Sequence, residues 1–257
     1  MRQRRAVIAL LIVGLFALGA GAAAWALVLR GDEVAPLALP SSAPGAASGA
    51  APTSSNPSVG GSATESLPAA SAGTVDAATL PGAWSIAPGS VVGYRVRERL
   101  ASLSADSDAV GRTSSITGSA TIAGGGPTLT LTAASFSVDM TTLRSDRSMR
   151  DNRLRNDGIQ TDQFPTATFE LTQPVGLPAS ALRGPFDVTL HGDLTLHGVT
   201  KSVEIPAQAQ LNGAVIQVLG SLEFPFSDFQ INAPNIGGFV AVEDHGTLEF
   251  LVNLAKA

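Results

Sequence analysis

The strongest constraint on the fold of this chain is a strict alternation of apolar and polar residues over long stretches of its second half. In residues 188–196 the apolar side chains occupy every second position, and the same pattern recurs in residues 92–97 and 248–254. A period of two predicts half-buried antiparallel β-strands. Similar runs cover residues 115–122, 128–138, 166–173, 200–211 and 215–224. Eight long strands favour an all-β barrel or sandwich, because βαβ units would need helical crossovers between the strands.

Two local features interrupt this strand pattern. Within residues 128–138 the apolar phase slips, which predicts a bulge near Ala133. Residues 146–156 are the one internal segment with helical character, and they carry Arg147, Arg150 and Arg153. One interpretation is a solvated helix whose arginines pair with neighbouring carboxylates. The other is a helix across the barrel mouth, whose arginines bind an anionic head group such as phosphate.

The amino-terminal third has a different character. A short basic tail, residues 1–5, precedes an apolar run over residues 6–29. At 1.5 Å per residue such a run spans roughly the 30 Å hydrocarbon core of a bilayer, which predicts a single transmembrane signal-anchor helix. The basic tail predicts a cytoplasmic amino terminus and an extracytoplasmic domain. The small residues 20–24 leave open the alternative of signal cleavage and secretion.

Residues 30–81 are rich in Ala, Ser, Pro and Gly and have almost no large apolar side chains. Such a segment buries too little surface to offset its conformational entropy, so we expect a disordered linker followed by a barrel domain over residues 82–257. The formal net charge of −5 gives no footprint for nucleic acid. The absence of cysteine excludes disulfides and thiolate metal sites. The sequence does not indicate an oligomeric state.

Catalytic or metal-binding arrangements are not apparent in the sequence. His191, Asp193 and His197 share one face of a strand, but the two histidines would lie about 20 Å apart at ~3.3 Å per residue. They are better explained as solvent-facing or turn residues than as zinc ligands. The pair Asp106 and Asp108 lacks the remaining ligands of a calcium loop. We therefore expect no catalytic residue, no metal and no cofactor.

Three motifs occur in a recognisable order. They are residues 145–155 (Ser-Asp-Arg-Ser-Met-Arg-Asp-Asn-Arg-Leu-Arg), residues 164–169 (Phe-Pro-Thr-Ala-Thr-Phe) and residues 192–203 (Gly-Asp-Leu-Thr-Leu-His-Gly-Val-Thr-Lys-Ser-Val). Together with residues 227–231 they resemble the YceI-like family of lipid- and polyisoprenoid-binding proteins, over residues 84–254. The resemblance implies an antiparallel eight-stranded lipocalin-like barrel, whose apolar cavity holds an isoprenoid tail.

The sequence departs from the family pattern in its first strand, where Arg95–Leu100 and a polar stretch follow, and in Asn152-Arg153 of the helical segment. These departures leave the identity of the head group open. The leading hypothesis is a membrane-tethered carrier of an amphipathic isoprenoid of the polyprenyl phosphate or quinone type. The alternative is a tethered structural or interaction module with a filled barrel and no ligand. The apolar candidates for the cavity are Phe136, Val138, Phe169, Leu171, Leu190, Leu194, Phe224 and Phe250.

Overall fold

A computed structural model describes residues 34–40, 77–100, 106–125, 128–178, 181, 183–233, 235–236 and 240–257. Of the first compact unit, residues 1–36, it describes only residues 34–36, and the account below concerns residues 37–257. The helices are α2 (Ser148–Asn156) and three short 3-10 segments, η1 (Ala77–Thr79), η2 (Met140–Thr142) and η4 (Phe226–Phe229). The strands are β1 (Gly82–Ile86), β2 (Val91–Leu100), β3 (Asp106–Thr113), β4 (Ile116–Gly125), β5 (Thr128–Asp139), β6 (Arg144–Ser145), β7 (Thr166–Leu171), β8 (Val175–Leu177), β9 (Phe186–Leu196), β10 (Val199–Asn212), β11 (Val215–Pro225), β12 (Asn235–Ile236), β13 (Val240–Val242) and β14 (His245–Lys256).

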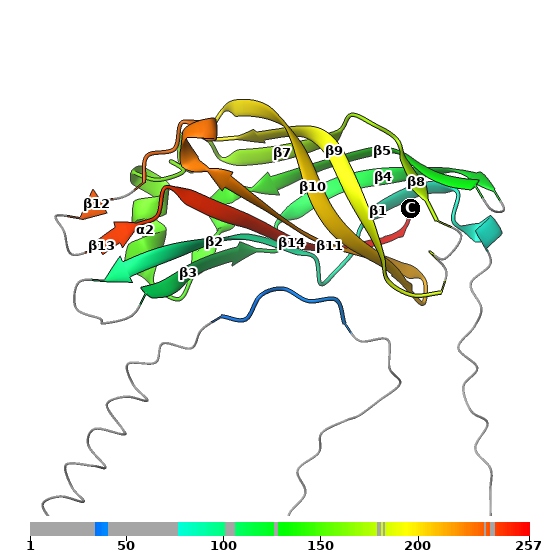
Figure 1. Cartoon of the computed structure of the whole chain (residues 1–257), viewed down its shortest axis with the longest axis horizontal. Coiled ribbons are helices and arrows are strands. Elements are labelled where there is room, and N and C mark those ends of the chain that lie inside the picture. Colours follow the sequence, from blue (N-terminus) through cyan, green and yellow to red (C-terminus); the bar gives the residue numbers. More distant parts are fainter. Residues whose placement is uncertain are drawn as a thin grey trace, which may run out of the picture. The chain divides into compact units, whose positions relative to one another are not determined.

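The long strands close into an antiparallel barrel (Figure 1). Eight strands form the closed circuit in the order β1-β4-β5-β7-β9-β10-β11-β14, and β1 pairs back with β14. The predicted all-β, eight-stranded barrel with one short α-helix is confirmed. One detail differs from the prediction. The strand β14 pairs with β1 at its carboxyl end and with β2 nearer its start, so β1 and β2 both lie along the same edge of β14. The predicted strands did not include β1, β3 or the short strands β6, β8, β12 and β13.

Both local interruptions of the strand pattern are present. The pairing of β4 with β5 shifts register between Thr121 and Ile122, so the bulge lies at Thr132, next to the predicted position. The helix α2 begins at Ser148, two residues after the predicted start, and ends at Asn156 as expected. A bulge increases local twist and bends the bulged strand. The bend in β5 therefore contributes to closing the barrel.

Alternation along the strands separates an apolar inner face from a more polar outer face. The buried side chains form two clusters inside the barrel. We call the first the apolar-end cluster; it consists of Leu80, Trp84, Ala120, Ile122, Leu129, Ala134, Val252 and Leu254. We call the second the helix-end cluster; it consists of Met140, Leu143, Ala167, Leu194, Leu196, Phe226, Phe229 and Ile231, and Leu154 of α2 packs against it.

Part of the predicted linker contacts the barrel. Leu80 falls inside the predicted linker, residues 30–81, yet it is 5% exposed, and its carbonyl accepts a hydrogen bond of 2.9 Å from Trp84 Nε1. Within the same range, the carbonyl of Pro40 accepts a hydrogen bond of 3.0 Å from Gln210 Nε2. Leu80 and Pro40 therefore contact the barrel, although the composition of the segment assigns both residues to the linker.

Most of the amino-terminal predictions concern residues that the structure does not describe. The basic tail (1–5), the apolar run (6–29) and the greater part of the linker lie outside the described ranges. Among the described residues, no helix combines the length and the apolar character needed to cross a bilayer. The transmembrane anchor therefore stays a prediction from the sequence.

Candidate functional site: an apolar cavity inside the barrel

An apolar cavity of about 210 Å³ lies inside the barrel. Strands β4, β5, β7, β9, β10, β11 and β14 contribute inward-facing side chains to its wall, and residues of both core clusters line it. All of the side chains proposed from the sequence as cavity residues lie on this wall, namely Phe136, Val138, Phe169, Leu171, Leu190, Leu194, Phe224 and Phe250. Whether they bind a ligand stays a prediction.

Glycines on neighbouring strands explain why the aromatic rings leave this interior hollow. Gly220 lies directly opposite Phe250 in the pairing of β11 with β14, and a Cβ atom at Gly220 would be 2.4 Å from Phe250 Cζ. Gly118 likewise lies directly opposite Phe136 in the pairing of β4 with β5, and a Cβ atom at Gly118 would clash with the ring of Phe136. Covering of a glycine by a cross-strand aromatic ring is a recognised feature of curved sheets. Because the rings lie on the wall over the glycines, they do not extend across the lumen.

Gly192, the first residue of the motif at residues 192–203, has the same role. A Cβ atom at Gly192 of β9 would be 2.4 Å from Phe169 Cζ and 2.5 Å from the carbonyl oxygen of Glu170. Both the ring and the backbone of β7 therefore require glycine at this position. The motif around Gly192 shapes the cavity wall, and it supplies no reactive group.

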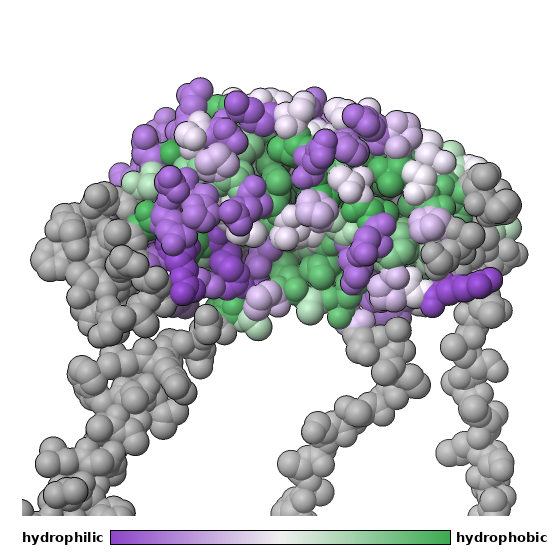
Figure 2. Space-filling model, in the orientation of Figure 1, coloured by the Kyte–Doolittle hydropathy of each residue, from purple (hydrophilic) through white to green (hydrophobic). Residues whose placement is uncertain are grey.

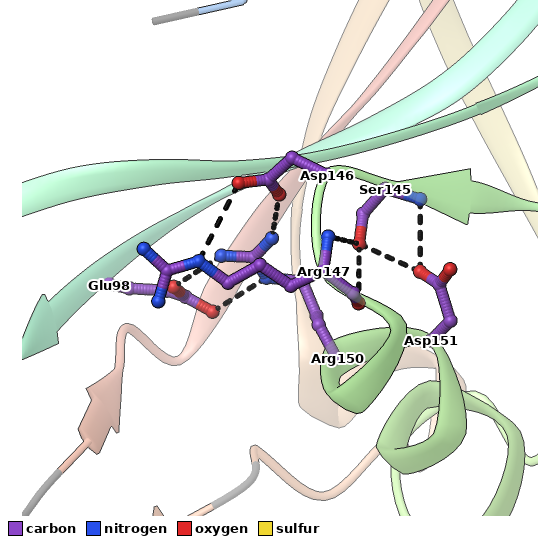
Figure 3. A network of polar contacts seen from close by, with 6 residues as sticks. All are labelled: Glu98, Ser145, Asp146, Arg147, Arg150 and Asp151. Atoms are coloured by element: carbon purple, nitrogen blue, oxygen red, sulfur yellow. Dashed lines mark hydrogen bonds and ion pairs between the residues drawn. The ribbon is translucent and has the colours of Figure 1, made fainter. Parts of the chain in front are cut away.

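The helix end of the cavity carries a network of ion pairs (Figure 3). Glu98 of β2 receives two hydrogen bonds from Arg150 of α2, at 3.1 Å from Nε and 2.9 Å from Nη2. Arg150 also donates to Asp146 through Nη1. Burial lowers the pKa of the Arg150 guanidinium, but the hydrogen bonds and charges of Glu98 and Asp146 outweigh it, so its pKa is raised. Arg150 is therefore a permanent cation that two carboxylates already neutralise.

Tyr94 lies on the cavity wall near this network. It is on the inward face of β2 and lines the cavity, and its ring lies over Gly111 of β3, where a Cβ atom would be 2.3 Å from Tyr94 Cε1. Its hydroxyl is buried and has no hydrogen-bond partner among the residues that the structure describes. Burial raises the pKa of Tyr94 above its ordinary value, so the phenol stays protonated.

The three arginines proposed as head-group residues lie in different environments. Arg150 is bound to Glu98 and Asp146, and its side chain is 15% exposed. Arg147 is 57% exposed, and its Nε lies 3.6 Å from Asp146 Oδ2. Arg153 is half-buried near the carboxyl end of α2. The ion pairs of Arg147 and Arg150 fit the interpretation in which these arginines pair with carboxylates.

The histidines of the strand motif have structural positions. His197 and Gly198 form the two-residue turn between β9 and β10, with φ angles of 53° and 72°, the left-handed values that tight hairpins require. The ring of His197 contacts the carbonyl oxygen of Phe229 through Nδ1 at 2.9 Å. His191 pairs with Glu204 at 3.5 Å. Among the described residues, no three histidine or acidic side chains gather at a distance suited to a metal ion.

Sequence reasoning missed Tyr94 and Glu98 as site residues and did not predict β3. The polar residues of β3 did not show the alternation of a strand, but Asp108 accepts hydrogen bonds of 3.0 Å from Arg95 and from Arg97 on β2. The available signal was the charge pattern: two arginines at alternate positions of one strand can face an aspartate on the next.

These features define a hollow antiparallel β-barrel with an apolar interior, a class of barrel with room for one small ligand. The YceI-like domain model matches residues 84–254. The chain therefore belongs to the YceI-like family, as its motifs predicted.

Similar proteins agree with this family. A UPF0312 protein of Vibrio parahaemolyticus is 34% identical over 115 residues, which are 42% of this chain and 58% of the relative. A UPF0312 protein of Shewanella denitrificans is 35% identical over 101 residues, or 37% and 50% of the two chains. The matches span about half the length of these curated relatives.

A solved structure shows the same fold. It is described as a polyisoprenoid binding domain from Saccharophagus degradans implicated in plant cell wall breakdown, and it superposes with a TM-score of 0.51 at 16% identity. The superposition covers 69% of this chain and 99% of that chain.

Proposed function

We propose that this protein binds an amphipathic isoprenoid lipid, of the polyprenyl phosphate or quinone type, with the tail inside the barrel cavity. The observation that carries the proposal is the open apolar lumen with its aromatic rings placed against glycines on the wall. A barrel that needs no ligand can fill its interior with its own side chains. Here inward glycines at 118, 192 and 220 remove side-chain volume where rings already stand. The polyisoprenoid-binding neighbour from Saccharophagus degradans supports the same class of ligand.

The proposed activity is sequestration or transport, and it requires no chemical step. Transfer of apolar surface from water contributes roughly 25 cal/mol for each Å² buried, which is sufficient to drive a long tail into an apolar cavity. The side chains on the cavity wall are mostly apolar, and Tyr94 and Gln210 are among the few that carry a polar group. We therefore propose a binding protein and not an enzyme.

The amino-terminal sequence supports a location for this activity. We propose that residues 6–29 anchor the chain in the cytoplasmic membrane, with residues 1–5 in the cytoplasm and the barrel outside. The linker would then let the barrel collect or deliver lipid near the bilayer surface. Cleavage within residues 20–24 is the alternative, and the barrel would then be secreted.

The direct test is lipid analysis of the purified full chain. The protein is produced in a bacterial host and extracted with organic solvent, and co-purified lipids are identified and counted by mass spectrometry. We expect about one long-chain lipid for each barrel, because eight-stranded barrels hold one small ligand.

A variant with a narrowed lumen tests whether the cavity holds that lipid. Gly220→Ala forces the ring of Phe250 off the wall, because the new Cβ would lie 2.4 Å from Phe250 Cζ. We expect about a tenfold loss of affinity for added geranylgeranyl lipid, or about 1.4 kcal/mol, within the range for overpacked cores. The matched control is Gly176→Ala on β8, where a Cβ atom has nothing within 4 Å.

Two results would contradict the proposal. Wild-type protein that carries no lipid and takes up no added isoprenoid would identify the barrel as a tethered structural or interaction module. Equal affinity of the Gly220→Ala and Gly176→Ala variants for geranylgeranyl lipid would place the lipid outside the lumen.

A further inference from the structure

The buried hydroxyl of Tyr94 is an unused hydrogen-bonding group at the helix end of the cavity. The ring cannot move toward β3, because it already lies against Gly111. The hydroxyl has no partner in the described part of the chain. A buried polar group without a partner is costly, so such a group in a native protein requires an explanation. The hydroxyl is covered in the unliganded barrel, so a ligand in the cavity would provide the missing partner by displacing the side chains that cover it.

The charges around Tyr94 favour a neutral ligand atom. The polar network contains the carboxylates of Glu98, Asp146 and Asp151 and the guanidinium groups of Arg147 and Arg150, and so has three negative charges against two positive ones (Figure 3). Asp151 also accepts hydrogen bonds from the backbone N–H and the hydroxyl of Ser145.

A phosphate next to Tyr94 would meet an arginine that two carboxylates already neutralise. Arg150, the arginine whose charge acts on Tyr94, already donates to both Glu98 and Asp146. The rest of the nearby cavity wall is formed mainly by apolar side chains such as Val138, Met140 and Leu143. Burial of a charge that has no partner is much more costly than burial of a neutral oxygen with one hydrogen bond.

We propose that Tyr94 is the head-group contact of this barrel, and that its hydroxyl donates a hydrogen bond to a neutral oxygen acceptor, such as a quinone carbonyl, in preference to a phosphate. This inference rests on the proposed binding of an isoprenoid tail in the cavity. It assigns the selectivity for the head group to Tyr94 and assigns Arg150 a positioning function, since Arg150 joins α2 to β2 through Glu98.

A competition experiment with matched tails tests the proposal. The full chain is incubated in detergent with equal amounts of a benzoquinone that carries a geranylgeranyl tail and of geranylgeranyl phosphate. Native mass spectrometry then counts each complex. We expect the wild-type protein to bind mainly the quinone. Tyr94→Phe removes only the hydroxyl, and we expect about fivefold weaker quinone binding, as for one lost neutral hydrogen bond, with phosphate binding unchanged.

The controls separate a lost head-group contact from a general defect. The Tyr94→Phe variant should be at least as stable to heat as wild type, because the hydroxyl that is removed has no partner among the described residues of the unliganded protein. Phe250→Leu, which changes the cavity wall away from the ion pairs, should weaken both probes alike. Preference for the phosphate, or unchanged quinone binding by Tyr94→Phe, would overturn this inference alone. Failure of both probes to bind would overturn the proposed function as well.

Discussion

The two ends of the barrel interior are closed by different chemistry. At the apolar-end cluster, Trp84 is 3% exposed and packs with Leu80 and Leu254. At the opposite end, Tyr94 lies near the ion pair that joins Glu98 of β2 to Arg150 of α2. The outer surface differs in the same direction, since hydrophilic side chains gather over the end that carries α2, β2 and β3 (Figure 2).

Because of this difference, the cavity has one apolar end and one polar end. The apolar end offers a tail mainly dispersion contacts and burial, whereas the helix end adds a hydrogen-bond donor and fixed charges. An amphipathic ligand of the proposed kind would therefore place its tail toward Trp84 and its head group toward Tyr94. The comparison also predicts that the two ends respond differently to substitution.

The largest effect should follow from substitution at the apolar end. Trp84→Ala removes a buried indole ring from the apolar-end cluster together with its hydrogen bond to the carbonyl of Leu80. Large-to-small substitutions of aromatic core residues cost about 3–5 kcal/mol. We expect the free energy of unfolding, measured by denaturant titration of the full chain, to fall by that amount. Trp84→Phe should retain most of the packing and lose much less. Similar losses in both variants would contradict the importance of ring volume at this end.

A smaller effect should follow at the helix end. Glu98→Gln leaves Arg150 with Asp146 alone, and the Glu98 and Arg150 side chains are 11% and 15% exposed. Removal of a hydrogen-bonded charge at a partly buried site costs about 1–3 kcal/mol. The same denaturant titration measures this loss.

The matched control is Glu204→Gln, whose side chain is 75% exposed on the outer face of β10. Its effect should stay within about 0.5 kcal/mol, as for most surface positions. A loss at Glu98 no larger than at Glu204 would mean that the ion pair does not stabilise the helix end.

The barrel itself could be predicted from the sequence because its information is local. Side chains on one face of a strand are two residues apart, so alternation alone predicted β9, β14 and the bulge in β5, although it did not distinguish the inner face from the outer one. The structure places all eight candidate apolar residues on the wall of the cavity. The family motifs then indicated how these strands are joined.

The helix end could not be predicted in this way, because its contacts join distant parts of the chain. Glu98 and Arg150 are 52 positions apart, and no periodic pattern indicates that α2 lies against β2. The same holds for Tyr94, which appeared as one more apolar position in the strand pattern. Two features distinguish Tyr94 from Val92 and Val96, and only the structure shows them. Its ring lies against Gly111, and charged side chains surround it.

The subtlest difference between the two ends is the titration of Tyr94. Burial raises its pKa above the ordinary value of 10.0, the charge of Arg150 lowers it, and the charges of Asp151, Glu98 and Asp146 raise it further. The unfolded chain therefore ionises first, so this group leaves stability unchanged below pH 10.0 and reduces it as the pH rises toward the folded pKa. The chain has one tyrosine, so ultraviolet absorbance of the phenolate reports Tyr94 alone. We expect that signal to appear together with unfolding, and Tyr94→Phe should lose less stability over the same alkaline range. A phenolate that forms near the ordinary pKa in folded protein would show that water reaches the hydroxyl, and the polar end of the cavity would then be open to solvent.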